Sequence, residues 1–137
     1  MSNAILKPRS ALDVAKSASR AQVALEVLDG LSVVWIAARK GQASALVTRV
    51  TELHGVTLPS NPRLVTSRSG IDFLGTGPEQ WLAIAPETAD LDLAAVLAGQ
   101  LTGLASVAGQ TDARTLVRVS GEKARDTLAK GLPIDMH

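Results

Sequence analysis

Residues 74–85 read Leu74-Gly75-Thr76-Gly77-Pro78-Glu79-Gln80-Trp81-Leu82-Ala83-Ile84-Ala85, and they set the arrangement of everything around them. An apolar segment runs into a Gly-Pro turn, and a second apolar segment leaves it. The turn cannot continue a strand ladder, because proline lacks an amide donor and glycine adopts turn dihedrals at little cost. The stretch therefore predicts two antiparallel strands joined by a tight loop.

Helical patterns flank this hairpin on both sides. A helix at about 40–54 is predicted by an apolar face made of Leu46, Val47, Val50 and Leu53. Gly55 is placed to end that helix in the left-handed conformation. A second helix at about 89–101, capped by Thr88 or Asp90, is predicted by an apolar face made of Leu93, Val96, Leu97 and Leu101.

Further strands complete a pattern over residues 32–108. The continuous apolar run at 33–37 suits a central strand covered on both faces, while 71–74, 104–108 and a short edge segment at 64–66 supply the others. The resulting order β-α-β-β-α-β is typical of an α+β, ferredoxin-like split βαβ fold. In it an antiparallel four-stranded sheet carries both helices on one face, with right-handed crossovers.

The N-terminal region leads into this unit. Residues 1–20 are basic and rich in Ser and Ala, and they form either a solvated arm or an arm that lies along a partner protein. Val23, Leu25 and Val27 occupy alternate positions, which predicts a half-buried strand. Asp29-Gly30 follows and predicts a two-residue hairpin turn to the strand at 33–37. We place the first folded unit at 21–110.

Residues 111–137 predict the start of a second β-α unit packed on the first. A strand at 115–119 leads to Ser120, an expected helix cap, and the helix ends at Gly131. This sequence shows no strand after that helix. We therefore expect one of two outcomes. Leu116, Val117 and Val119 pair into the first sheet, or an exposed apolar patch is covered by a partner chain or by residues absent here. The patch would consist of Ala124, Leu128, Leu132 and Ile134.

Composition excludes several classes of function. A net charge of +1 over 137 residues, with one Phe and no Tyr, argues against a nucleic-acid binder, which needs a basic face and stacking aromatics. The chain has no Cys and only two His residues, which excludes thiolate chemistry and a His-rich metal site. It has neither a long apolar run nor an apolar signal-peptide core, so we expect a cytoplasmic protein without a membrane segment.

The usual catalytic patterns are also missing. Gly75-Thr76-Gly77 resembles part of a dinucleotide loop, but the third glycine is absent and a strand follows where a helix is required. No serine has a nucleophile-elbow context. Helix capping explains the paired carboxylates of Asp90 and Asp92, and His54 suits the last turn of a helix.

The remaining candidates have ordinary explanations. Trp35 and Trp81 could stack a ligand, although core packing suits tryptophans on apolar strands better. Three arginines could hold a carboxylate or phosphate, although solvated or interface arginines are commoner: Arg114, Arg118 and Arg125. We therefore assign no catalytic, cofactor-binding or metal-binding residue from the sequence.

Three segments together resemble one family. They are the helix and loop from Gly41 to Pro59, the run Gly77-Pro78-Glu79-Gln80-Trp81-Leu82, and above all residues 112–137, which read D-A-R-T-L-V-R-V-S-G-E-K-A-R-D-T-L-A-K-G-L-P-I-D-M-H. Over roughly residues 25–137 the chain is similar to the gamma subunit of heterotetrameric sarcosine oxidase. The Gly-Pro-Glu-Gln-Trp segment alone is shared with folate-binding relatives, including the aminomethyltransferase of glycine cleavage.

This resemblance implies a role in a multichain flavoprotein. Such an enzyme oxidises sarcosine to glycine and yields hydrogen peroxide, with the one-carbon unit released as formaldehyde or passed to tetrahydrofolate. It implies alpha and beta subunits that hold FAD, FMN and NAD, with a delta subunit as a further candidate partner. It also implies a gamma chain with a folate-binding fold but no cofactor of its own. Chains of the family normally continue past the Pro-Ile-Asp-x-His segment, where this sequence ends. The alternative reading is a tetrahydrofolate-binding or one-carbon-transfer module, with the arginines near 114–125 meeting a glutamate tail.

Overall fold

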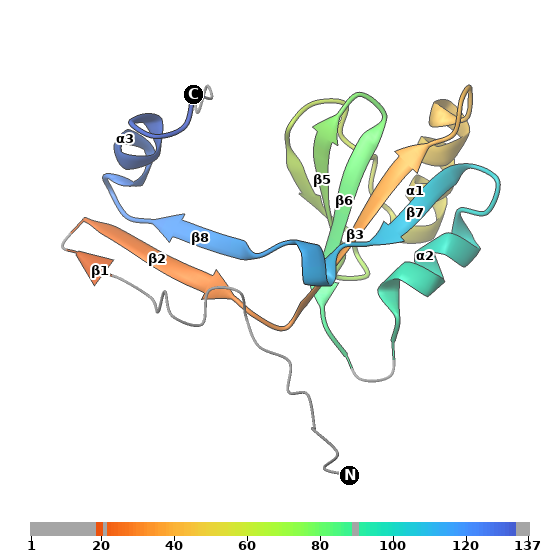
Figure 1. Ribbon diagram of the computed structural model, residues 1–137. Helices are drawn as coiled ribbons and strands as arrows, with labels where there is room; N and C mark the ends of the chain where they lie inside the picture. Colours follow the sequence, from red (N-terminus) through yellow and green to blue (C-terminus); the bar gives the residue numbers. More distant parts are fainter. Residues whose placement is uncertain (1–18, 21, 89–90, 134–137) are drawn as a thin grey trace, which may run out of the picture. The chain divides into compact units, whose positions relative to one another are not determined.

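The computed structural model describes residues 19–20, 22–88 and 91–133 (Figure 1). The chain forms two compact units. The first, called unit 1 below, combines residues 1–29 with 115–137, and the second, called unit 2, is the continuous segment 30–114. The strand predicted at 23–27 therefore shares a unit with the C-terminal β-α segment rather than with the central hairpin.

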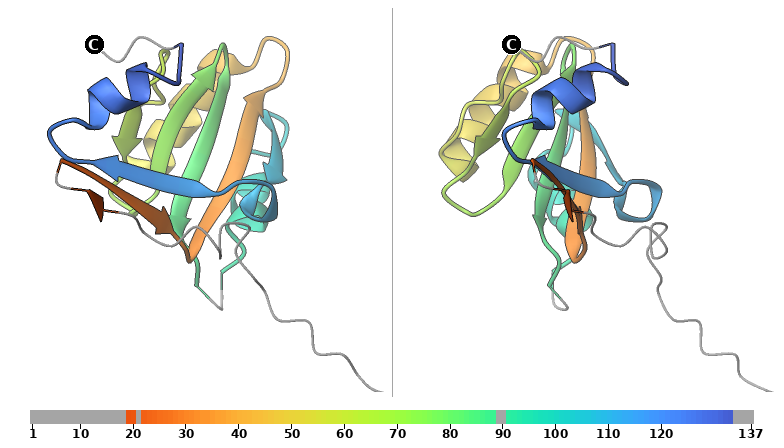
Figure 2. Two further views of the ribbon diagram at one scale, coloured as in Figure 1. Left: turned by 60° about the vertical axis from the view of Figure 1, so that its left-hand side comes forward. Right: turned by 90° about the vertical axis from the view of Figure 1, so that its left-hand side faces the viewer.

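Unit 2 has the predicted ferredoxin-like order. Its elements are β3 (Leu31–Ala38), α1 (Ala43–His54), β4 (Leu64–Thr66), β5 (Asp72–Gly77), β6 (Gln80–Pro86), α2 (Leu93–Gln100), β7 (Ala105–Gly109) and a 3₁₀ turn at Thr111–Ala113. The strands form one antiparallel sheet in the order β4-β5-β6-β3-β7. The left view of Figure 2 shows them side by side, with β3 between β6 and β7. The α+β prediction is confirmed, and β4 is the expected edge strand.

The central hairpin is also confirmed. β5 and β6 pair from Asp72 opposite Ile84 to Gly77 opposite Gln80, so Pro78 and Glu79 make the turn. Glu79 has a φ of 56°, the left-handed region that a tight turn requires. A register irregularity between Gly75 and Gly77 gives the strand a bulge next to the turn.

Strand register divides the sheet of unit 2 into two faces. One face packs against both helices and forms a continuous core that includes Val34, Ile36, Phe73, Trp81 and Ala83 from the sheet, Leu46 and Val50 from α1, and Leu93 and Leu97 from α2. The other face carries an apolar row that crosses all five strands: Leu64, Leu74, Leu82, Trp35 and Ala108. Val33 and Val34, on opposite faces, are both buried, which confirms that β3 is a central strand.

Unit 1 contains β1 (Ser19–Arg20), β2 (Val23–Leu28), β8 (Leu116–Ser120) and α3 (Ala124–Ala129). Its sheet has the order β1-β2-β8, with β2 antiparallel to both neighbours. The hairpin predicted at Asp29-Gly30 is therefore wrong. Gly30 does turn the chain with a φ of 71°, but β6 and β7 occupy both edges of β3, so β2 has no edge there to pair with.

Two other local predictions need correction. Ser120 does not cap a helix, because it is the last residue of β8, and α3 begins only after Lys123. At α2 the cap is Asp92, whose carboxylate accepts a hydrogen bond of 3.1 Å from the Ala95 amide. Thr88 instead forms an isolated bridge with Leu91, and Asp90 lies outside the described residues.

The sequence left open whether the C-terminal strand pairs with the first sheet. β8 does not join the five-stranded sheet, since all five of its pairs are with β2. On the following helix, Ala124 and Leu128 are half-buried and Leu132 is 45% exposed, while Ile134 lies outside the described residues. Within the described residues, no helix is long and apolar enough to cross a membrane.

Candidate functional site

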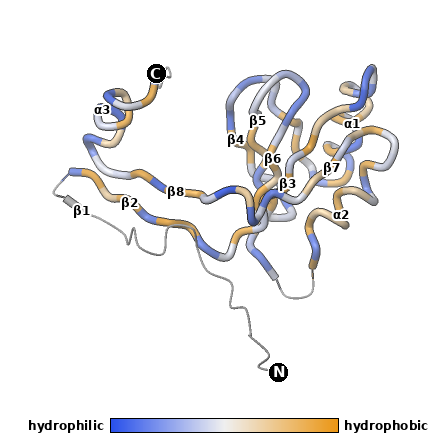
Figure 3. Tube along the Cα trace, in the orientation of Figure 1, coloured by the Kyte–Doolittle hydropathy of each residue, from blue (hydrophilic) through white to orange (hydrophobic). Residues whose placement is uncertain are grey.

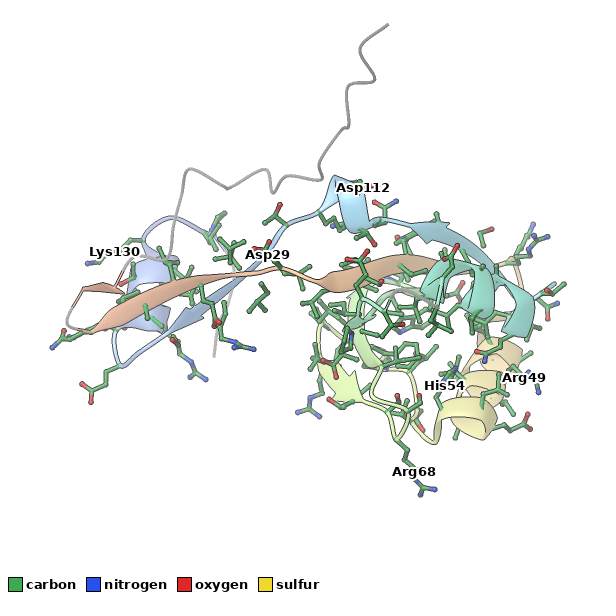
Figure 4. All side chains as sticks on the ribbon, turned by 90° about the horizontal axis from the view of Figure 1, so that it is seen from below. Asp29, Arg49, His54, Arg68, Asp112 and Lys130 are labelled. Atoms are coloured by element: carbon green, nitrogen blue, oxygen red, sulfur yellow. The ribbon has the colours of Figure 1, made fainter. Side chains whose placement is uncertain are left out.

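A hydrogen-bonded cluster around His54 is the group of described residues in unit 2 that most resembles a chemical site. His54 is the last residue of α1, as expected, but its side chain is buried, with its ring centroid 5.6 Å from that of Phe73. Its Nδ1 lies 3.1 Å from Ser69 Oγ, and its Nε2 lies 3.0 Å from Gln100 Oε1. In Figure 4 His54 lies among the packed side chains, whereas Arg49 and Arg68 point outward.

The amide oxygen of Gln100 determines which atoms donate and which accept along this chain of hydrogen bonds. Gln100 Oε1 can only accept, so Nε2 donates to it, and in the neutral ring Nδ1 then accepts from Ser69. Ser69 Oγ also lies 2.9 Å from Ser67 Oγ, which accepts from the Ile71 amide at 3.0 Å. The chain of bonds is satisfied throughout if Ser67 donates to Ser69.

This arrangement superficially resembles a serine-histidine-amide triad. Three cavities of about 350 to 670 Å³ are formed by described residues of unit 2, and His54, Ser69 and Gln100 line none of these three. The cluster instead joins the C-terminal ends of α1 and α2 to the turn at 67–70. We interpret it as a structural clamp. Sequence reasoning missed it because only tertiary folding brings Ser69 and Gln100 to the two nitrogens of His54.

The two tryptophans occupy different environments. Trp81 is buried in the core, as its apolar strand suggested, and its indole N–H donates a 2.7 Å hydrogen bond to the Pro59 carbonyl. Trp35 is half-buried on the helix-free face, and its indole N–H lies 3.3 Å from Gln80 Oε1. Trp81 also borders a cavity of about 390 Å³, whose lining is mostly apolar and has Glu79 as its single charged group. Ser44 and Ser60 also line that cavity, but among the described residues no His or Lys lines it to activate them.

A larger cavity of about 670 Å³ opens between β3, the start of α2 and the 3₁₀ turn. Among the described residues, its lining includes three carboxylates, from Glu87, Asp92 and Asp112, and no Lys or Arg. A polyanionic ligand such as a polyglutamate tail would be repelled there. One of the three carboxylates already serves as the cap of α2.

The candidate arginines do not come together in a cavity. Arg114 belongs to unit 2, whereas Arg118 and Arg125 belong to unit 1. Arg118 pairs with Glu26 across the β2–β8 ladder at 3.0 Å, and both side chains are more than half exposed. None of the three arginines lines either of the cavities described above.

The glycine pair of the possible dinucleotide loop belongs to the bulged end of β5, and a strand follows it, as expected. Gly75 has a steric role instead. A Cβ atom at this position would collide with the carbonyl oxygen of Asn61, because the loop between α1 and β4 passes directly over the strand. Within the described residues, no group of three or more His, Cys, Asp or Glu side chains is placed to hold a metal ion.

The residues thus define an α+β protein with a ferredoxin-like unit and a small second sheet, whose polar clusters serve packing. No family model and no curated protein matches the chain. Among solved structures it is similar to a chain of the heterotetrameric sarcosine oxidase from Corynebacterium sp. U-96, determined in complex with pyrrole 2-carboxylate. The TM-score is 0.66 and the sequence identity 26%, over 93% of this chain and 64% of the other. This chain is thus structurally related to a component of that heterotetramer, and it spans 64% of that component's length.

Proposed function

We propose that the chain is a non-catalytic gamma subunit of a flavin-dependent heterotetrameric sarcosine oxidase, where it serves assembly. The observation that carries this proposal is the structural similarity to a sarcosine oxidase chain over 93% of the sequence. The C-terminal motif at 112–137, noted from the sequence, supports the choice of the gamma subunit. In the cytoplasm the complex would convert sarcosine, water and oxygen to glycine, formaldehyde and hydrogen peroxide, or pass the one-carbon unit to tetrahydrofolate.

The internal chemistry of unit 2 is consistent with a supporting role. His54, the buried base of this unit, is engaged on both ring nitrogens, and Trp81 is engaged by a backbone carbonyl. These groups hold secondary-structure elements together. Flavin and nicotinamide chemistry would then belong to the alpha and beta subunits, and a delta subunit would be the third partner of this chain.

Co-expression with the other chains of a heterotetrameric sarcosine oxidase tests the proposal. The chain alone is expected to be colourless and without oxidase activity, and it should co-purify with the flavin-bearing chains when expressed with them. An isolated chain that is yellow and produces hydrogen peroxide from sarcosine would contradict the proposal. So would failure to co-purify with any of the other chains.

The alternative function, a tetrahydrofolate-binding or one-carbon-transfer module, requires a cationic pocket for the glutamate tail. Instead, carboxylates line the larger cavity of unit 2. Calorimetric titration separates the two functions. We expect no binding heat with near-millimolar tetrahydrofolate, and a saturable heat would favour the folate module.

A further inference from the structure

Unit 1 lacks a core of its own within the described residues. None of the side chains described at 22–29 and 115–133 is buried. Leu25, Val117 and Leu132 are among the most exposed large apolar residues of the protein, at 42%, 43% and 45%. A small sheet with one short helix cannot normally stabilise itself in water without burying an apolar face.

The register of β2 and β8 places most of the large apolar residues of this sheet on one face. Leu25 lies opposite Val119, and Val27 lies opposite Val117. The other face has Ala24 opposite Ser120, Glu26 opposite Arg118 and, at the end of the ladder, Leu28 opposite Leu116. We call the first surface the β2–β8 apolar face; it consists of Val23, Leu25, Val27, Val117 and Val119. Figure 3 shows hydrophobic segments along both strands.

This face differs from the centre of the helix-free face of unit 2, although Leu64 at the edge of that sheet is also 50% exposed. There Val33, Leu82 and Ile84 are already buried, at 1%, 7% and 8% exposure. On the β2–β8 apolar face all five side chains are exposed or half-buried. An exposed cluster of large apolar side chains on one face of a strand pair is typical of an interaction surface.

The charges of unit 1 indicate what kind of partner fits. Its described residues carry five Lys and Arg and four Asp and Glu, which leaves it nearly neutral. Nucleic acids and anionic membranes attract basic surfaces, so neither is favoured here. An apolar face with few charges is instead typical of the buried centre of a stable protein–protein interface.

We infer that the β2–β8 apolar face is the surface through which this chain docks onto a different chain of the oxidase. This inference rests on the proposed function, because the similarity to a chain of a heterotetramer favours a different chain over a second copy. The partner supplies the apolar layer that unit 1 lacks, and docking completes the fold of unit 1.

Paired substitutions at neighbouring positions test this inference. Leu25→Glu and Val117→Glu place a carboxylate on the apolar face, whereas Ala24→Glu and Ser120→Glu place the same carboxylate on the opposite face of the same strands. Both tryptophans lie in unit 2, so intrinsic fluorescence reports whether that unit remains folded in every variant. Each variant is co-expressed with the other chains of a heterotetrameric sarcosine oxidase, and the amount that co-purifies is measured.

We expect Leu25→Glu and Val117→Glu to reduce co-purification at least about tenfold, since burying an unpaired carboxylate costs several kcal/mol. The two control variants should co-purify nearly as well as the unmodified chain. If both apolar-face variants assemble normally, the inference is wrong although the proposed function stands. If the unmodified chain fails to assemble, the proposed function is wrong. If the unmodified chain alone forms a dimer that Val117→Glu dissociates, the occupant is a second copy and the inference is overturned.

Discussion

Units 1 and 2 use the same local pattern with opposite results. In each unit, apolar residues alternate along antiparallel strands, and at least one strand is followed directly by a helix. In unit 2 two helices cover one face of the sheet, and Ile36, Leu46, Phe73 and Leu97 are completely buried. In unit 1 no described side chain is buried. Alternation therefore specifies a strand and its two faces, but a core requires a second layer to cover one of them.

The largest contrast should appear when a large side chain is shortened in each unit. Phe73→Ala removes a fully buried ring and should lower the free energy of unfolding by about 3–5 kcal/mol. Val117→Ala removes a 43% exposed side chain and should cost the isolated chain less than about 1 kcal/mol. Urea unfolding followed by circular dichroism measures both. Equal losses in the free energy of unfolding would mean that Val117 packs in a core, which would contradict its exposure in unit 1.

Substitution of Gly75 should show how tightly the loop between α1 and β4 packs on the sheet of unit 2. Gly75→Ala forces a methyl group against the Asn61 carbonyl and should destabilise the protein by about 1–3 kcal/mol. Gly77→Ala is the matched control in the same strand, because a Cβ there meets no atom within 4 Å. Thermal unfolding of the two variants makes the comparison. A Gly75→Ala variant as stable as Gly77→Ala would show that the loop does not press on the strand.

The clamp at His54 should have a smaller effect. Ser69→Ala leaves the Nδ1 of a buried imidazole without its donor, and we expect a loss of about 1–2 kcal/mol in the free energy of unfolding. Ser106→Ala, at an exposed position of β7, should change the stability by less than about 0.5 kcal/mol. Chemical denaturation followed by tryptophan fluorescence reports unit 2 directly. An unchanged midpoint for Ser69→Ala would argue against the proposed ordering of the hydrogen bonds.

The smallest effect is expected for the ion pair of unit 1. Glu26 and Arg118 are each more than half exposed, so their coupling energy should be below about 1 kcal/mol and should fall as salt is added. A double-mutant cycle with Glu26→Ala and Arg118→Ala measures it. A coupling of several kcal/mol that resists salt would mean that this face is buried, contrary to the distinction between the two faces of the sheet.

The sequence predicted the elements of unit 2 well because each carries a local signal. The Gly77-Pro78 turn, the apolar helix faces and Gly55 at the end of α1 all lie within a few residues of the structure they specify. Pairing between distant segments has no such signal. Asp29-Gly30 looks like a hairpin turn, yet β2 pairs with β8 about ninety residues later, because β6 and β7 fill both edges of β3.

The same limit applied to the polar clusters. His54 was correctly placed at the end of a helix, but its partners Ser69 and Gln100 come from separate elements that no local pattern connects. Asp92 rather than Asp90 caps α2 because the helix begins at Leu93, the first residue of its apolar face, and not at the predicted start near residue 89. The sequence suggested only that Gly75 resembles part of a dinucleotide loop. The structure shows why glycine is required there, because the Asn61 backbone crosses the strand where a Cβ atom would lie.

Hydrogen exchange of the backbone amides, measured segment by segment with mass spectrometry, tests the central claim most directly. The account predicts that β3, β5 and β6 are strongly protected both in the isolated chain and in the co-expressed oxidase complex. The amides of β2 and β8 should exchange rapidly in the isolated chain and become protected in the complex, because the partner completes the fold of unit 1. Protection of β2 and β8 in the isolated monomer equal to that of β3 and β6 would contradict the account.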